Sequence, residues 1–225
     1  MFGIGGRRKA PEAVAQVPEL ADLDAADDMA EADVDWRADG PFDFDEVELG
    51  DEQRLDLGTL IVTGFPGMQI QLAQDAAGKA QSVLAVWNES ALECTLFAEE
   101  VSIGAGESVK GRLDTLAAEA VAAGGEASWE EDQGPFGPLL QIVVPVRAKG
   151  KSLVQVSRVW AVNGPRWLLQ GRLFGELATC PPDDPKVGVF IELFRNLVVR
   201  RGADPLPPGE PIALSIPQGG SDGEA

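Results

Sequence analysis

Three arginines and a tryptophan lie close together around an Asn-Gly dipeptide at positions 163 and 164. Arg158 precedes this dipeptide, and Arg166, Trp167 and Arg172 follow it. Guanidinium groups donate paired hydrogen bonds to phosphates and carboxylates. An indole ring can stack on a planar ligand or pack in a core. These four side chains are the candidate ligand-binding residues, and anion binding is the chemistry that they predict.

An antiparallel hairpin over residues 154–174 is predicted to position these side chains. Asn-Gly between two apolar segments is the strongest short-range hairpin signal in a sequence. A two-residue turn at this dipeptide places Trp160 directly opposite Trp167, most simply as a packed pair in the core. Because side chains alternate between the faces of a strand, Arg158 then lies on the same face as both indoles.

Each arginine of the hairpin has a binding and a structural interpretation. Arg166 and Arg172 are expected on the second face, where they could bind a phosphate, a carboxylate or an acidic peptide. They could equally pair with a carboxylate of the chain and cover apolar surface with their stems. Arg158 points toward the core, where a guanidinium needs a charged partner. We expect Asp43 or Asp45 to be that partner.

No other catalytic or metal-binding pattern is present in the sequence. The chain has no histidine, which removes the commonest general base and metal ligand. The spacings of a phosphate-binding loop and of a nucleophile elbow are absent. We therefore predict no catalytic residue, no metal and no cofactor. Cys94 is expected to be a small buried apolar residue.

Composition limits the partners that the chain can bind. Its 225 residues carry a formal net charge of −19, and the pI is about 4.2. This charge opposes nonspecific nucleic-acid binding and docking on anionic membranes. No apolar run approaches the roughly 20 residues of a membrane-spanning helix, and no apolar segment follows the first basic residues. The sequence predicts a cytoplasmic protein.

Residues 1–52 are predicted to be a disordered, acidic N-terminal arm. Positions 11–52 hold 16 acidic residues and one basic residue, so this segment contributes −15 of the total −19. Low apolar content and high like charge cannot offset the entropy of ordering a chain. The end of the arm also carries Trp36, Phe42 and Phe44. Such a segment docks on its own domain, docks on a partner or stays disordered, and the sequence leaves these alternatives open.

Residues 53–202 are predicted to form one folded domain. Alternating apolar runs separated by short turns are typical of an antiparallel meander. Besides the hairpin, strands are expected at 57–63, 68–74, 79–87, 91–98, 126–131 and 139–147. Residues 203–225 are rich in proline and glycine and are expected to form an extended C-terminal tail.

Two amphipathic helices are expected to complete the domain. The first covers 108–123 and stops at a Gly-Gly pair. The second covers 186–199, with Asp184 as its N-cap and Pro185 at its first position. The predicted fold class is α+β. We expect an antiparallel sheet of meandering strands with both helices packed on one face, preceded by the disordered acidic arm.

Five short stretches carry a resemblance to a known group of proteins. They are DGPFD at 39–43, RLDLG at 54–58, GPFG at 134–137, NGPRW at 163–167 and VVRRG at 198–202. Together with the MFG…RRK start, they resemble an uncharacterised actinobacterial family of cytoplasmic proteins, a domain-of-unknown-function group. The resemblance implies an actinobacterial source. In that family we expect aspartate at Asn163 and arginine at Gln170. No activity is established there, so none is carried over.

The sequence favours a non-enzymatic cytoplasmic module that binds another protein. Its expected binding elements are the acidic-aromatic arm and the arginine-bearing face of the sheet. The alternative is an anion- or small-ligand-binding domain, or an enzyme, with Arg158, Arg166 and Arg172 around the ligand. The identity of the partner is not predicted.

Overall fold

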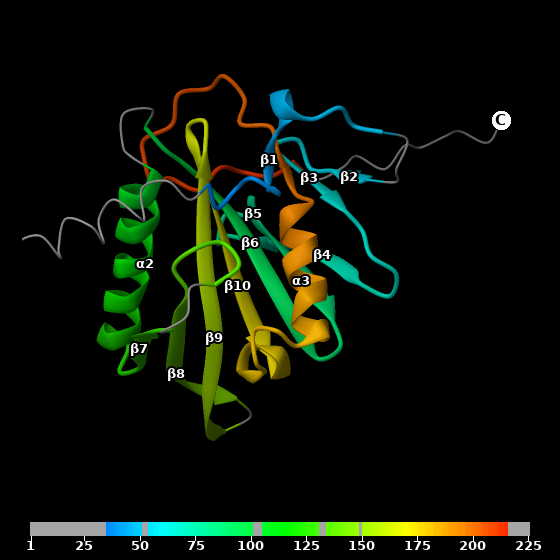
Figure 1. Ribbon diagram of the computed structural model, residues 1–225. Helices are drawn as coiled ribbons and strands as arrows, with labels where there is room; N and C mark the ends of the chain where they lie inside the picture. Colours follow the sequence, from blue (N-terminus) through cyan, green and yellow to red (C-terminus); the bar gives the residue numbers. More distant parts are fainter. Residues whose placement is uncertain (1–34, 51–53, 101–104, 131–133, 149, 216–225) are drawn as a thin grey trace, which may run out of the picture. The chain divides into compact units, whose positions relative to one another are not determined.

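The computed structural model describes residues 35–50, 54–100, 105–130, 134–148 and 150–215. It confirms the predicted α+β class, with helices packed on antiparallel strands (Figure 1). The prediction of disorder for residues 1–34 lies outside the described residues. No described helix is long and apolar enough to cross a lipid bilayer.

The main sheet contains seven antiparallel strands. Its spatial order is β4-β5-β6-β10-β9-β8-β7. The strands are β4 (Gln69–Gln74), β5 (Ala80–Trp87), β6 (Ser90–Ala98), β7 (Glu126–Trp129), β8 (Leu140–Ala148), β9 (Lys151–Gly164) and β10 (Trp167–Gly175). Two meanders, β4-β5-β6 and β7-β8-β9-β10, join along β6 and β10. The predicted meander is therefore confirmed from β4 onward, whereas residues 60–63, expected in its first strand, belong to a second sheet.

The two helices pack on opposite faces of this sheet, so the expectation that they share one face is wrong. Helix α2 (Ala105–Ala122) packs Leu113 and Leu116 with Val159 of β9. Helix α3 (Pro185–Arg195) packs Phe190 and Phe194 with the other face, in the core that contains Trp160. Adjacent residues of a strand point to opposite faces, and Val159 and Trp160 are both apolar. The two faces of this central strand can therefore pack into two different hydrophobic cores.

The hairpin of β9 and β10 is present, but its turn lies two residues later than predicted. Trp167 pairs with Gly164, and Trp160 pairs with Gly171, so the two indoles are not opposite each other. The turn is formed by Pro165 and Arg166, whose φ is +62°. A proline followed by a residue with positive φ is the pattern of a type II turn. The shift changes the pairing by an even number of residues, so the predicted division of side chains between the faces is kept.

A second, small sheet has the order β1-β11-β3-β2. Its strands are β1 (Phe42–Asp43), β2 (Arg54–Asp56), β3 (Leu60–Thr63) and β11 (Val198–Val199). The second helix was predicted to reach residue 199, but α3 ends at Arg195 and the chain enters β11. The two valines fit the apolar spacing of the helix. Pairing with β1 and β3 decides their conformation.

The last part of the predicted arm belongs to the fold. Residues 35–50 contact the domain through β1, which pairs in parallel with β11, and through the 3-10 helix η1 (Phe44–Glu46). The amide of Phe42 also donates to the carbonyl of Leu197, over 3.0 Å. The prediction of disorder up to residue 52 is therefore wrong for 35–50. This stretch docks on its own domain.

The described part of the C-terminal tail lies along the ends of the strands. Ile212 donates its amide to the carbonyl of Leu96, and Leu214 donates to that of Ala80. Both side chains are buried in the core that also holds α3. The tail is extended as expected, but these contacts make residues up to 215 part of the folded domain.

Candidate binding surfaces

Arg158 is buried in a charge pair, as its position on the core face predicted. Its side chain lies beside α3, and only 8% of the residue is exposed. The Nε group donates to Oε1 of Glu130 over 2.6 Å, and Nη1 donates to the carbonyl of Cys180. The expected partners Asp43 and Asp45 are wrong. Glu130 and Cys180 thus hold the guanidinium of Arg158 inside the fold.

Arg172 lies on the opposite face of the sheet, beside α2. Its Nε group donates to Oγ of Ser157 over 3.1 Å, and its guanidinium carbon lies 5.0 Å from the centroid of the Phe174 ring. Glu93 occupies the facing position on β6. Burial lowers the pKa of Arg172, against the opposing influence of Glu93. This arginine is half-buried and does not share a site with Arg158.

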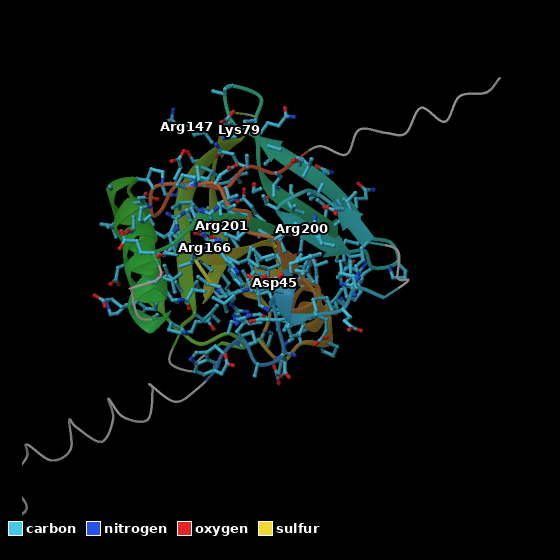
Figure 2. The ribbon with its side chains drawn as sticks, turned by 90° about the horizontal axis from the view of Figure 1, so that it is seen from above. Asp45, Lys79, Arg147, Arg166, Arg200 and Arg201 are labelled. Carbon is cyan, nitrogen blue, oxygen red and sulfur yellow. The ribbon has the colours of Figure 1, made fainter. Side chains whose placement is uncertain are left out.

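Arg166 occupies the exposed turn between β9 and β10 and faces Arg201 rather than the other two predicted arginines. Arg201 donates through Nε to the carbonyl of Arg166 over 3.1 Å and through Nη1 to that of Asp204. Arg166 donates to the carbonyl of Gly202. Burial and the charge of Arg166 lower the pKa of Arg201. Figure 2 shows this pair, with Arg200 nearby, at the turn end of the sheet.

The three predicted arginines are thus separated, and Trp167 is fully buried. Exposure of Trp167 is 0%, and its Nε1 group donates to Oδ2 of Asp43 over 2.8 Å. The guanidinium carbon of Arg37 lies 5.6 Å from the centre of the indole. Trp167 therefore fixes the end of the arm on the domain and offers no face for stacking on a ligand.

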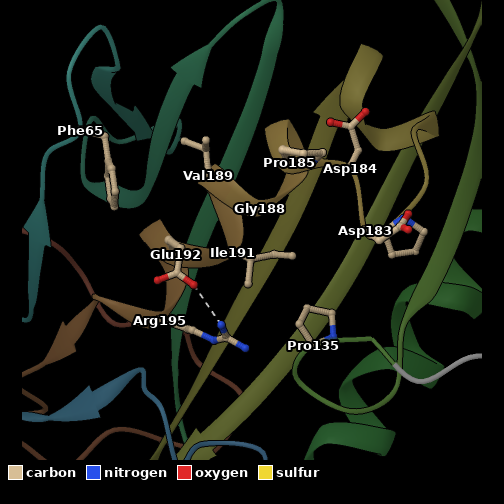
Figure 3. A pocket seen from close by; sticks show the side chains of 11 residues that line it. Phe65, Pro135, Asp183, Asp184, Pro185, Gly188, Val189, Ile191, Glu192 and Arg195 are labelled. Carbon is tan, nitrogen blue, oxygen red and sulfur yellow. Dashed lines mark hydrogen bonds and ion pairs between the residues drawn. The ribbon is translucent and has the colours of Figure 1, made fainter.

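A shallow depression crosses the outer surface of α3, and we call it the α3 depression (Figure 3). It is open to solvent and has a volume of about 530 Å³. Phe65 lies on one side of the helix, and Pro135 lies on the other. The apolar residues that line it are Phe65, Pro135, Pro182, Pro185, Val189 and Ile191. Gly188 lies in the middle of the depression, on α3, and has no side chain to fill it.

Carboxylates form the polar part of the α3 depression. Asp183, Asp184 and Glu192 line it together with one cation, Arg195. Asp184 is the N-cap of α3, since its Oδ1 accepts from the amide of Lys186 over 2.8 Å. Arg195 donates to Oε1 of Glu192 over 2.9 Å. The depression therefore combines an apolar floor with an excess of negative charge.

Sequence reasoning missed this depression, although it predicted the helix and its cap. Phe65 and Pro135 are far apart in the sequence and lie in loops, so only the folded chain brings them to α3. The signal available was the polar stripe of the second predicted helix, where Gly188 and Val189 interrupt the charged residues. A small and an apolar residue on an otherwise polar face are weak indications of a contact surface.

The cysteines and carboxylates of the described residues bear on the predicted absence of a metal site and on the predicted burial of Cys94. They contain no group of three or more Cys, Asp or Glu side chains placed to hold a metal ion. Cys94 is buried as predicted, and burial raises the pKa of its thiol. Cys94 and Cys180 are both free thiols.

These features define an α+β domain in which a seven-stranded antiparallel sheet is enclosed by one helix on each face. Residues 40–222 match the family described as "Protein of unknown function (DUF3710)". The chain belongs to this family. No curated protein matches the sequence.

One solved structure is similar in part. It is the solution structure of cyanobacterial PsbP (CyanoP) from Synechocystis sp. PCC 6803, with a TM-score of 0.39 and 10% sequence identity. The match covers 68% of this chain and 98% of that chain. A likeness of this size carries no argument about function.

Proposed function

We propose that this chain is a non-enzymatic cytoplasmic protein-binding module that contacts its partner through the α3 depression. The observation that supports the proposal is the apolar floor of the depression, which includes Phe65, Val189 and Ile191. Apolar side chains gathered at an open surface are typical of protein interaction sites. A small-molecule site is usually more enclosed.

The charge of the depression defines the chemistry of the partner segment. Asp183, Asp184 and Glu192 outnumber the one cation, Arg195, which is already paired with Glu192. A lysine or arginine of the partner gains favourable interactions at this rim, while an apolar side chain beside it fills the floor. We infer that the partner presents a segment with apolar anchors and basic residues.

The proposal places less weight on the two binding elements expected from the sequence. The aromatic side chains of the arm at Trp36, Phe42 and Phe44 are half-buried on the domain itself. Arg172 is half-buried between Ser157 and Phe174. The proposal therefore keeps the predicted class of function and moves the contact surface to α3.

Two features support the cytoplasmic location that the proposal includes. Both cysteines are free, which fits a reducing compartment. The chain also carries a strongly acidic net charge, which disfavours adsorption on anionic membranes. An actinobacterial source is likewise part of the proposal, and it rests on the five short stretches described above.

Affinity capture with matched variants tests the proposal. Val189→Asp places a charge on the apolar floor, and Asp183→Lys reverses a charge at the rim without touching the helix cap. We expect each variant to recover at least tenfold less of the partner captured by the wild-type chain. Ser152→Asp, on the exposed end of β9, is the control and should capture a normal amount. Equal capture by all four proteins would contradict the proposed surface.

A further inference from the structure

We propose that the outer edge of β4 pairs with β4 of a second copy of this chain, forming an antiparallel, two-fold symmetric dimer. β4 is the last strand on one side of the seven-stranded sheet (Figure 1). Among the described residues, no strand pairs with its outer side. An unpaired strand edge presents backbone donors and acceptors that favour the addition of another strand.

Residues 69–72 of β4 lack the features that normally keep an edge strand from pairing. Its six residues, QIQLAQ, include no charged residue and no proline. Its one irregularity is a register shift between Ala73 and Gln74, at the end of the strand. Charges, prolines and bulges are the usual means by which monomeric proteins block strand addition. Residues 69–72 therefore form a neutral and regular pairing edge.

The other edges of the two sheets are short or protected. β7 has four residues and packs against α2. β2 has three residues, of which Arg54 and Asp56 are charged, and β1 has only two residues. Among the described edges, β4 is thus the one built to accept a long partner strand.

The side chains of β4 define the register of the pairing. Ile70 and Leu72 pack against the core on the α3 side of the sheet but remain half-buried, whereas Gln69 and Gln71 are exposed. When Gln71 lies opposite Gln71 of the second copy, Ile70 of each copy lies opposite Leu72 of the other. This register buries two apolar cross-strand pairs and places two amides together at the symmetry axis.

The occupant is a second copy because the edge is self-complementary. An antiparallel pair of identical strands satisfies the same backbone groups on both sides of the axis. Each copy carries a net charge of −19, so repulsion opposes the dimer at low ionic strength. We therefore expect the dimer to become tighter as the salt concentration rises.

Sedimentation velocity of the full chain and of charge variants at the axis tests the inference. The wild-type chain should be dimeric at micromolar to millimolar concentrations in salt, and Gln71→Lys should raise the dimer dissociation constant at least tenfold. Gln71→Glu should do the same, since both variants place like charges opposite each other. An equimolar mixture of the two variants should associate more tightly than either alone. Ser152→Lys is the control and should dimerise normally.

Hydrogen exchange and circular dichroism complete the test. The amides of residues 69–74 should exchange more slowly as the protein concentration rises, and the variants should keep the wild-type circular dichroism spectrum because Gln71 is exposed. A wild-type chain that stays monomeric would overturn the inference. So would a dimer that Gln71→Lys leaves unchanged, or variants that do not associate when mixed. Because none of these measurements uses the α3 depression, their failure is distinguishable from failure of the proposed function.

Discussion

The indole Nε1 group of Trp167 donates a hydrogen bond of 2.8 Å to Oδ2 of Asp43, 124 residues earlier in the chain. This bond joins the first residue of β10, in the seven-stranded sheet, to the end of the acidic arm. Oδ1 of the same aspartate accepts from the amide of Asp45 and caps η1. One carboxylate therefore orders the local turn of the arm and holds it on the domain.

Replacing this carboxylate is expected to destabilise the whole fold. Asp43→Ala leaves the buried N–H group of Trp167 without an acceptor, which costs about 1–3 kcal/mol of unfolding free energy. Urea denaturation measures this change. Asp45→Ala is the control, since Asp45 is exposed and its expected effect is within about 0.5 kcal/mol. In a double-mutant cycle with Trp167→Phe, the two losses should not add. Additive losses would show that the hydrogen bond contributes nothing.

Gly171 is required by the close approach of Trp160. A Cβ atom at residue 171 would lie 2.6 Å from Nε1 of Trp160 and 3.0 Å from a ring carbon of Phe194. Overpacking of this kind costs about 1–3 kcal/mol, so Gly171→Ala should lower the melting temperature. Gly111→Ala is the matched control, because a Cβ there meets no atom within 4 Å and lies in α2. It should raise stability slightly. A Gly171→Ala chain with an unchanged melting temperature would contradict the close packing of residue 171 against Trp160.

The pair between Arg158 and Glu130 is expected to matter far more than a surface pair. Glu130→Ala leaves a buried guanidinium with the Cys180 carbonyl as its remaining hydrogen-bond partner among the described residues, and removal of one member of a buried pair costs about 3 kcal/mol. Asp114→Ala breaks the exposed pair with Lys110 and should change stability by less than about 1 kcal/mol. Chemical denaturation of both variants gives the comparison. Equal losses of unfolding free energy in the two variants would mean that water reaches the guanidinium of Arg158 once Glu130 is removed.

The ion pair between Arg37 and Glu46 is expected to make the free energy of unfolding depend on pH in the acid range. The guanidinium of Arg37 donates to Oε1 of Glu46 over 2.8 Å, and this hydrogen bond lowers the pKa of Glu46. A carboxyl whose pKa is lower in the folded state stabilises the fold above its unfolded pKa, about 4.3. That contribution is lost as the pH falls through the folded pKa.

Carboxyl NMR titration of the Arg37→Gln variant checks this linkage. The pKa of Glu46 should rise toward its ordinary value, and the acid loss of stability should become shallower below about pH 4.3. An unchanged pKa of Glu46 would show that Arg37 does not set it. Circular dichroism should confirm that the variant stays folded at neutral pH.

The sequence predicted much of the fold where local chemistry decides the structure. Asp184 followed by Pro185 correctly marked the start of α3, and alternation correctly separated the faces of β9 and β10. The turn of that hairpin lies two residues beyond the predicted one because Gly164 is the cross-strand partner of Trp167 and Pro165 and Arg166 form the turn instead. A Cβ at residue 164 would lie 2.1 Å from the Trp167 ring. The Asn-Gly signal alone cannot distinguish a glycine needed for a turn from one needed beside the large ring of a cross-strand neighbour.

The candidate site was harder to predict, because its members come together only in the folded chain. Arg158 was correctly expected to need a carboxylate, but the chain offers many acids and geometry selects Glu130. Arg201 lies beside Arg166 because residues 198–199 form β11, where the sequence predicts the end of a helix. The α3 depression likewise depends on two loops that flank the helix.

Photo-crosslinking from α3 tests the central claim most directly. A benzophenone amino acid at Val189 of the full chain, in the source cell, should form an adduct with a protein that presents apolar and basic residues at the crosslinked peptide. The same amino acid at Ser152 should not form that adduct. Adducts from position 152 but not from position 189 would contradict the assignment of α3 as the binding surface. So would adducts from position 189 whose yield Asp183→Lys does not lower.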